Sequence, residues 1–235
     1  MEKTEIFPGG LTFRAGPGVF PLSTDTMVLG DFVRLPQAAR VVDLGSGSGA
    51  LGLLLCGRYA GCRVTGVELS PAVHQAALDN IARNRLFGRL ESLLGDIRQV
   101  RQLLPAGGYQ CVVSNPPYFS GGRPSCGPAG PQARQETACT LAQVYAAAAW
   151  LLPTGGQFCL IHRPERLTDL LALGRQHGLE PKNLRLVRHR AGSAPSLALV
   201  RCLRGGKPGL TLEPELVLYR DDGSLTPEGR RIYGR

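Results

Sequence analysis

The sequence of 235 residues has no hydrophobic run long enough to cross a membrane. A transmembrane helix needs about 20 consecutive apolar residues, and the longest apolar run here, Ala146–Leu152, is better explained as the buried end of a helix. The first ten residues, Met1–Gly10, include Glu2, Glu5 and Pro8 and lack the hydrophobic core of a secretion signal. We therefore expect no membrane association and a location in the cytoplasm.

Metal-binding and redox motifs are also missing. The seven cysteines are an odd number, no two form a Cys-x-x-Cys pair, and no histidine stands at metal-ligand spacing. Several of them, such as Cys111 and Cys159, lie in apolar runs, where a free cysteine behaves as a small hydrophobic residue. We predict reduced structural thiols and no metal site, as suits a reducing compartment.

Acidic residues are scarce relative to basic ones. The chain has 27 Lys and Arg against 18 Asp and Glu, a net charge of +9, and no Asp or Glu between Pro181 and Leu212. Such a balance favours polyanionic partners such as nucleic acid, although an arginine-rich codon bias and a solvated face are the alternatives. The cations of this stretch that we expect to face RNA are Lys182, Arg185, Arg188, Arg190 and Lys207.

Strand-like and helix-like segments alternate along the chain. The predicted strands are Arg40–Leu44, Arg63–Glu68, Leu90–Leu94, Tyr109–Ser114, Gln157–His162, Leu184–Arg188 and Leu197–Leu203. The predicted helices are Ala50–Tyr59, Pro71–Asn84, Ile97–Leu104, Leu141–Leu152 and Pro164–His177. This alternation is typical of an α/β fold with a doubly wound, mostly parallel sheet, here of seven strands, and helices on both faces. We expect one domain with a Rossmann-like core over 40–203 and extensions over 1–39 and 204–235, and we expect the Gly- and Pro-rich segment Phe119–Gln135 to be a mobile loop.

The first chemical motif is a glycine loop, Val41–Gly49, in which a strand ends at Asp43 and a helix begins near Gly49. Glycine stands at every second position, whereas the dinucleotide fingerprint needs Gly-x-Gly-x-x-Gly and would place its last glycine at Ala50. An acid just ahead of Gly-x-Gly-x-Gly resembles the loop of S-adenosylmethionine (SAM) methyltransferases, which lies under the methionine part of the cofactor; a turn without a ligand is the alternative. The residues that we expect at the cofactor here are Asp43, Gly45, Ser46, Gly47 and Gly49.

Two later strand ends carry further cofactor candidates. Glu68, followed by Leu69, ends the second strand, where a carboxylate can accept hydrogen bonds from both ribose hydroxyls. Asp96 and Ile97 follow the third strand and could contact the adenine amino group and ring. Asp96 is equally suited to cap a helix, and one aspartate can do both.

The motif Asn115-Pro116-Pro117-Tyr118 closes the fourth predicted strand, beside the glycine loop. An amide or aniline-like nitrogen is a poor nucleophile because its lone pair is delocalised. Two acceptors, the Asn115 side-chain oxygen and the Pro116 carbonyl, would hold such an amino group with its lone pair toward the methyl, and the two prolines fix the direction of that carbonyl. Tyr118 offers a face on which a planar substrate can stack. These four residues are the predicted catalytic set, and we expect Asn115 to contact the cofactor as well; a rigid turn is the alternative.

Together, Asp43–Gly49 and Asn115–Tyr118 resemble the amino-methyltransferases that modify planar nitrogens. Other segments narrow the resemblance, across nearly the whole chain, to the bacterial tRNA adenine-N6-methyltransferases that act on a valine tRNA. These segments are Ser23–Thr26, Ala133–Glu136, Leu160–Pro164, Arg204–Pro208, Leu212–Leu216 and the tail through Tyr219 to Gly234. The resemblance implies a class I SAM methyltransferase fold, SAM as cofactor, and the anticodon stem-loop of tRNA as partner. The implied target is the adenosine 3′ of the anticodon.

The resemblance also implies roles for single residues. In the family the Asn-Pro-Pro-Tyr residues handle the target base, which assigns Asn115, Pro116 and Tyr118 to it. The family's Ser-x-Asp element lies against the cofactor, which points to Thr24 and Asp25 here.

One motif departs from the family pattern. Arg134-Gln135-Glu136 stands where the family often has Arg-His-Glu, which bears on RNA contact and base placement. We expect Arg134 to contact RNA, with an ion pair to Glu136 as the alternative. His162 and Arg163 stand at the end of a predicted strand. They could line the crevice, where Arg163 would contact RNA, or have a structural role.

We expect the protein to be a monomer.

Other functions stay open at this point. A release-factor glutamine methyltransferase shares Asn-Pro-Pro-Tyr but normally carries a substantial helical domain before the glycine loop. An rRNA guanine-amino methyltransferase is a second alternative, and a DNA adenine methyltransferase usually has a larger recognition region. A non-catalytic RNA-binding or SAM-sensing module is disfavoured by the two intact motifs, and a dehydrogenase by the glycine spacing.

Overall fold

The computed structural model describes residues 4–5, 10–15, 22–117 and 139–234. Within them, β3 (Arg40–Leu44), β4 (Arg63–Glu68), β5 (Leu90–Leu94), β6 (Cys111–Ser114), β7 (Gln157–His162), β8 (Leu179–Arg188) and β9 (Pro195–Arg204) form the long strands of the sheet. The helices are α1 (Thr24–Phe32), α2 (Ala50–Arg58), α3 (Pro71–Arg83), α4 (Val100–Leu103), α5 (Leu141–Leu151), α6 (Leu167–Gln176) and α7 (Pro227–Tyr233). Short strands β10 (Thr211–Leu212) and β11 (Leu216–Val217) pair with β8, and β1 (Thr4–Glu5) pairs with β2 (Thr12–Phe13).

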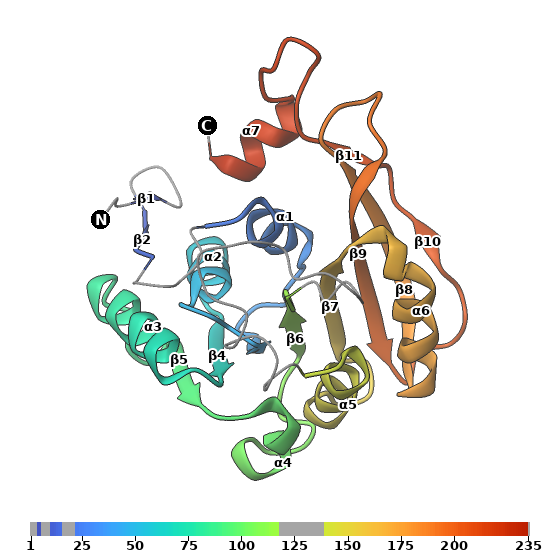
Figure 1. Ribbon diagram of the computed structural model, residues 1–235. Coiled ribbons are helices and arrows are strands. Elements are labelled where there is room, and N and C mark those ends of the chain that lie inside the picture. The colour runs from blue at the N-terminus through green and yellow to red at the C-terminus, as the bar shows by residue number, and fades with distance from the viewer. Residues whose placement is uncertain (1–3, 6–9, 16–21, 118–138, 235) are drawn as a thin grey trace, which may run out of the picture.

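The sheet order is β10-β8-β9-β7-β6-β3-β4-β5 (Figure 1). β3, β4, β5, β6 and β7 are parallel, and β9 runs antiparallel to both β7 and β8. The chain passes from β3 to β4 and β5 in one direction and from β6 to β7 in the other. The order therefore reverses between β3 and β6, and a crevice for ligands is expected at the carboxyl ends of these two strands.

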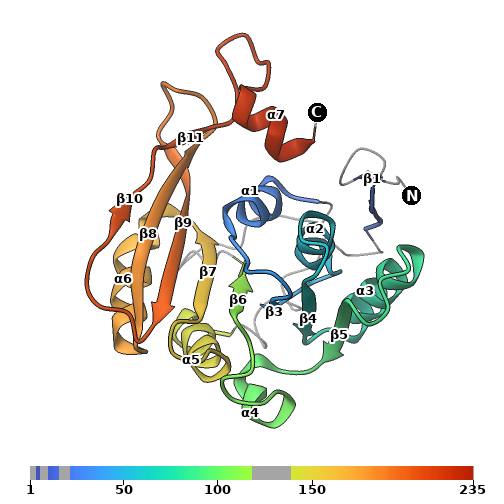
Figure 2. The ribbon, with the colours of Figure 1, turned by 180° about the vertical axis from the view of Figure 1, so that it is seen from behind.

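Strand residues alternate between two apolar layers because successive side chains point to opposite faces of a sheet. Val41 packs in the layer with α1 and α2, while Val42 packs in the layer with α5. Cys111 and Val112 alternate in the same way on β6. Helices α1 and α2 lie on one side of the strands and α4, α5 and α6 on the other (Figure 2). The predicted α/β fold with a mostly parallel sheet covered on both faces is confirmed.

The seven predicted strands are all present, and two short strands join them. The main sheet has nine strands in the part of the chain that the structure describes, because the two-residue strands β10 and β11 extend the seven expected ones. β8 also begins five residues before the predicted Leu184, since the strand continues through Pro181, where a register shift against β9 accommodates a residue without a backbone donor. The predicted helix over Ile97–Leu104 consists of a 3-10 turn, Ile97–Gln99, followed by α4.

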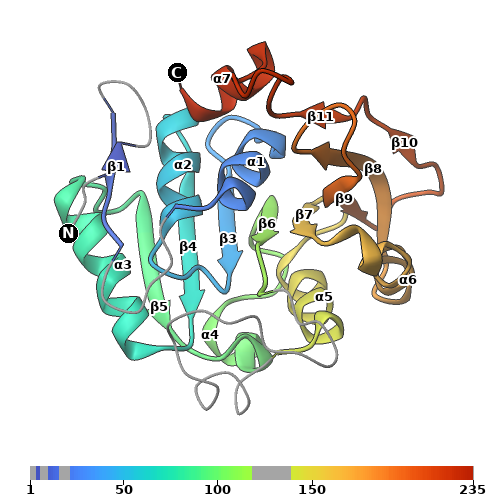
Figure 3. The same cartoon turned by 45° about the horizontal axis from the view of Figure 1, so that its top comes forward.

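Two helices that lie outside the predicted elements flank the sheet. Every residue of α1 from Met27 to Phe32 is buried, including Gly30, so the helix shows no polar face that a periodic pattern could reveal. α7, from the C-terminal extension, lies beside α1 (Figure 3). No helix of the described residues is long and apolar enough to cross a membrane.

Candidate active site

The glycine loop turns sharply at the carboxyl end of β3. Gly45, Gly47 and Gly49 all adopt positive φ, at 73°, 58° and 83°, a region that other residues enter at a cost. The Gly45 and Ser46 amides donate to the Val67 carbonyl at 3.0 and 3.1 Å, which ties the loop to the end of β4. Among the described residues nothing lies within 4 Å of a Cβ built on Gly45 or Gly47. The backbone therefore borders open space, into which a ligand could come close.

Glu68 lies at the other wall of this space. Its Oε2 accepts from the Gly47 amide at 3.0 Å, and its Oε1 accepts from the Ser70 amide at 2.8 Å. A carboxylate has about four acceptor positions, so these two bonds leave capacity for two hydroxyl groups. Leu94, which pairs with Glu68 across β4 and β5, and Leu69, which follows Glu68, are 48% and 39% exposed, so apolar surface lies next to this carboxylate. This combination fits a ribose bearing an aromatic base.

Asp96 caps the turn that follows β5. Its Oδ1 accepts from the Arg98 amide at 2.8 Å and its Oδ2 from Arg98 Nε at 2.7 Å, and the hydrogen bond from the Arg98 side chain lowers the pKa of Asp96. The helix-cap role considered from the sequence is thus present. The predicted contact of Asp96 and Ile97 with adenine stays a prediction.

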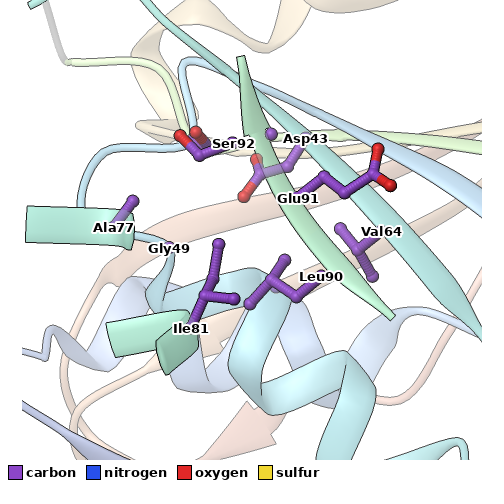
Figure 4. A pocket seen from close by; sticks show the side chains of 11 residues that line it. Asp43, Gly49, Val64, Ala77, Ile81, Leu90, Glu91 and Ser92 are labelled. Atoms are coloured by element: carbon purple, nitrogen blue, oxygen red, sulfur yellow. The ribbon is translucent and has the colours of Figure 1, made fainter. Parts of the chain in front are cut away.

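Asp43 is buried beneath the loop rather than open to solvent. The residue is only 2% exposed, and among the described residues its Oδ2 has no hydrogen-bond partner. Burial, and secondly the charge of Glu68, raises the pKa of Asp43 to about 7. Asp43 lines a cavity of about 10 Å³, with Ser92 on the same side of the cavity and Leu90 and Ile81 on the opposite side (Figure 4).

The variant Asp43→Asn is expected to remove a pH-dependent part of the stability. The carboxyl titrates near 3.8 when unfolded and at about 7 when folded, so between these values the folded state binds the extra proton. The free energy of unfolding of the wild type therefore falls as pH rises through this window, by up to about 1.4 kcal/mol per pH unit, and levels off above it. Urea unfolding from pH 4 to 8 should show the variant gaining stability relative to wild type as pH rises. A difference that is the same at every pH contradicts this prediction.

Asn115 follows β6 and stands next to the glycine loop. Ser114 Oγ donates to the Leu44 carbonyl at 2.9 Å, joining the carboxyl ends of β6 and β3. The Asn115 Nδ2 donates to Thr26 Oγ1 on α1 at 3.2 Å. Pro116 is buried and Pro117 exposed, while Tyr118 lies outside the described residues. The structure therefore brings Asn115 and the glycine loop together, as the sequence motifs predicted.

The N-terminus of α1 completes the site. Thr24 and Asp25 are half-buried there, and the Thr24 hydroxyl is 2.9 Å from the Tyr233 hydroxyl of α7. Sequence reasoning missed Thr26 and Tyr233 as parts of the site. The Ser23-x-x-Thr26 spacing was the available signal, since Ser23 caps the helix by accepting from the Thr26 amide at 3.2 Å.

The predicted RNA-facing cations fall into two groups. Arg185 is only 9% exposed and donates to the Pro214 carbonyl and, at 2.9 Å, to Glu228, while Arg188 pairs with Glu215 at 2.5 Å. Both guanidinium groups hold the C-terminal extension to β8, so the RNA role predicted for them gains no support. The other described cations of the set lie nearer to solvent; Arg190, Lys207 and Arg163 are exposed and Lys182 is half-buried. Arg134 lies outside the described residues.

Two other groups bear on the predictions from sequence. His162 is 2% exposed, its Nδ1 accepts from the Arg163 amide at 2.8 Å, and burial lowers its pKa to about 4. Six cysteines in the described part of the chain are free thiols, five of them buried. No cluster of three His, Cys, Asp or Glu side chains within the described ranges could hold a metal ion.

Comparison with known proteins identifies the family. A model of the methyltransferase small domain matches residues 10–171. The tRNA1(Val) (adenine(37)-N6)-methyltransferase of Dickeya chrysanthemi (strain Ech1591) is 31% identical over 223 residues, covering 91% of this chain and 88% of that protein. The enzyme of the same name from Tolumonas auensis is 31% identical over 208 residues, covering 88% and 85%.

Solved structures agree on the fold. A predicted O-methyltransferase of Agrobacterium tumefaciens superposes with a TM-score of 0.72 at 24% identity, covering 89% of this chain and 95% of the other. A geranyl diphosphate methyltransferase in complex with SAM superposes with a TM-score of 0.57 at 14% identity, covering 76% and 84%. By its matched domain and its relatives, this chain belongs to the methyltransferase small domain family and, within it, to the tRNA1(Val) (adenine(37)-N6)-methyltransferases.

Proposed function

We propose that this protein transfers a methyl group from SAM to the N6 amino group of an adenosine in tRNA, at the position 3′ of the anticodon of a valine tRNA. The observation that carries the proposal is the placement of Asn115 at the end of β6, beside the glycine loop at the end of β3. The curated relatives of that activity match about nine tenths of the chain, including its C-terminal extension. A cytoplasmic location and a monomeric state belong to the proposal.

The residues present fit SAM as the cofactor. Open space borders Gly45 and Gly47, Glu68 has capacity for hydroxyl groups, and Leu69 and Leu94 offer apolar surface next to it. When bound, the cofactor supplies an electrophilic methyl on a sulfonium. Gly47 and Glu68 would hold its methionine and ribose parts, and Asp96 and Ile97 its adenine.

The chain's own contribution to the transfer is alignment. The Asn115 oxygen and the Pro116 carbonyl accept the two hydrogens of the adenine amino group, which directs the nitrogen lone pair toward the methyl. Holding the reacting atoms roughly 3–3.5 Å apart supplies most of the catalytic effect in such a displacement. The extra proton leaves after attack, so no strong general base is required.

RNA binding would use the solvent-exposed cations. Lys182 donates to the Lys207 carbonyl at 3.2 Å, so the two lysines lie close together in the chain fold near the β8 edge of the sheet. Together with Arg190 and Arg163 they would contact phosphates, which position the RNA and do not read its sequence. Bases of an anticodon loop are single-stranded, so moving one into the site costs at most a few kcal/mol.

A methyl-transfer assay with labelled SAM on total tRNA tests the proposal. Nucleoside mass spectrometry should find N6-methyladenosine, and nuclease mapping should place it 3′ of the anticodon of a valine tRNA. Methylation of rRNA or of a release factor, with none on tRNA, would overturn the assignment. Total tRNA should come from cells in which the gene for this protein has been deleted, because its target adenosine is then unmethylated. The same tRNA without added protein gives the background signal.

A further inference from the structure

The reaction requires one particular orientation of the Asn115 amide. Its oxygen can accept a hydrogen from the adenine amino group, whereas its own NH₂ group is a donor and would repel that amino group. The two ends of an amide have nearly the same size and shape, so packing alone does not choose between them. A hydrogen-bond partner that accepts from the NH₂ end must therefore set the orientation. This inference rests on the function proposed above.

Thr26 is that partner in the structure. Asn115 Nδ2 donates to Thr26 Oγ1 at 3.2 Å, across 89 positions of sequence. The Thr26 hydroxyl is also 3.1 Å from Ser23 Oγ. A hydroxyl group can accept one hydrogen bond and donate another, so Thr26 can accept from Asn115 while it donates to Ser23. When Thr26 donates to Ser23 it accepts from Asn115 Nδ2, as the structure has it, and Oδ1 is then the end of the amide that can accept from a substrate.

The helix that carries Thr26 is fastened at several points. Asp31, 2% exposed, accepts from Arg58 of α2 at 2.7 Å and from Arg231 of α7 at 2.9 Å. Burial alone would raise the pKa of Asp31, but the hydrogen bonds from Arg231 and Arg58 outweigh burial and hold that pKa below its usual value. At the other end of α1, Thr24 meets the Tyr233 hydroxyl at 2.9 Å. These contacts from α2 and from the C-terminal helix hold the N-terminus of α1 against Asn115.

We propose that Thr26 is a positioning residue for methyl transfer, which orients the Asn115 amide so that its oxygen faces the target amino group. The hydroxyl acts through Asn115 and makes no contact with the reacting atoms. Loss of the hydroxyl should therefore lower the rate of methyl transfer in the bound complex and leave the affinities for cofactor and tRNA unchanged.

The matched variants Thr26→Val and Thr26→Ser separate the hydroxyl from the shape of the side chain. Valine keeps the branched shape and removes the oxygen, whereas serine keeps the oxygen. We expect Thr26→Val to lower kcat on valine tRNA by about 10- to 100-fold, as misplacement of a positioned group does. KM for tRNA and the Kd for SAM should stay within about twofold of wild type, because an interaction that acts only on the bound transition state changes kcat alone. Thr26→Ser should restore kcat to within about threefold of wild type on the same reasoning.

A double-variant cycle with Asn115→Ala tests the route of the effect. If Thr26 acts through Asn115, Thr26→Val will lower kcat in the wild-type background and will not lower it further once Asn115 is alanine. Circular dichroism and thermal melting of each variant identify any that fails to fold, and Thr26→Ser keeps the test decisive in that case.

The possible outcomes are distinct. Equal losses in the valine and serine variants, or a full additional loss on top of Asn115→Ala, would overturn the positioning role. So would a change confined to KM. Failure of the proposed function gives a different result: the wild-type protein would then form no N6-methyladenosine on tRNA from any strain.

Discussion

Replacing Asn115 with alanine will lower kcat for adenosine methylation by about 100- to 1,000-fold, the loss typical of removing one preorganised polar group from a transition state. The amide is held at the reaction edge of the sheet by the Ser114 bond to Leu44 and by Thr26. Alanine removes the acceptor that turns the amino lone pair toward the methyl. Single-turnover methylation of valine tRNA with saturating enzyme and SAM measures the chemical step directly.

Cofactor binding provides the internal control for this prediction. Asn115→Ala should lose far less in SAM affinity than in kcat, because the Glu68 and glycine-loop contacts to the cofactor stay intact. Gln110→Ala is the matched control variant, since Gln110 carries an exposed amide just before the amino end of the same strand. Turnover in Gln110→Ala should be unchanged. A rate for Asn115→Ala within tenfold of wild type would show that the motif does not align the target amino group.

Much of the fold could be predicted because its signals are local. Strands β3, β4, β5 and β7 have the predicted bounds, since each is a short segment rich in apolar residues that turn residues or charges bound. The glycine loop and Asn115 were also recognisable, because both follow strand ends that a doubly wound sheet brings to one edge. Helix α1 escaped prediction since its residues from Met27 to Phe32 are buried on all sides.

What the sequence could not supply was long-range pairing. The stretch from Pro181 to Leu212 lacks acids, but two of its arginines pair with acids of the C-terminal extension: Arg188 with Glu215 and Arg185 with Glu228. The basic stretch therefore has the sequence pattern of an RNA-binding surface, although two of its arginines hold the C-terminal extension to β8. Thr26 was missed for the same reason, because its partner Asn115 is distant in sequence.

Replacing Glu68 with alanine is expected to weaken SAM binding by about 100-fold. Two hydrogen bonds from ribose hydroxyls to a carboxylate contribute about 1.5 kcal/mol each at the low end of the range for charged partners, and about 1.4 kcal/mol corresponds to tenfold in Kd. The carboxylate also holds the loop at the Gly47 amide. Asp79→Ala, which removes an exposed carboxylate from α3, is the matched control for the change in net charge. Isothermal titration with SAM and with S-adenosylhomocysteine measures both variants.

The two roles of Glu68 can be separated with a cofactor analogue. S-Adenosylhomocysteine without its 2′-hydroxyl should bind wild type more weakly than the natural product does, because one hydroxyl partner of the carboxylate is gone. In Glu68→Ala the two ligands should bind equally, since the group that distinguishes them is absent. If the analogue loses the same affinity in both proteins, Glu68 does not bind the ribose. Its part in the site is then to hold Gly47 and Ser70 in the loop, and the ribose hydroxyls must be bound by other residues.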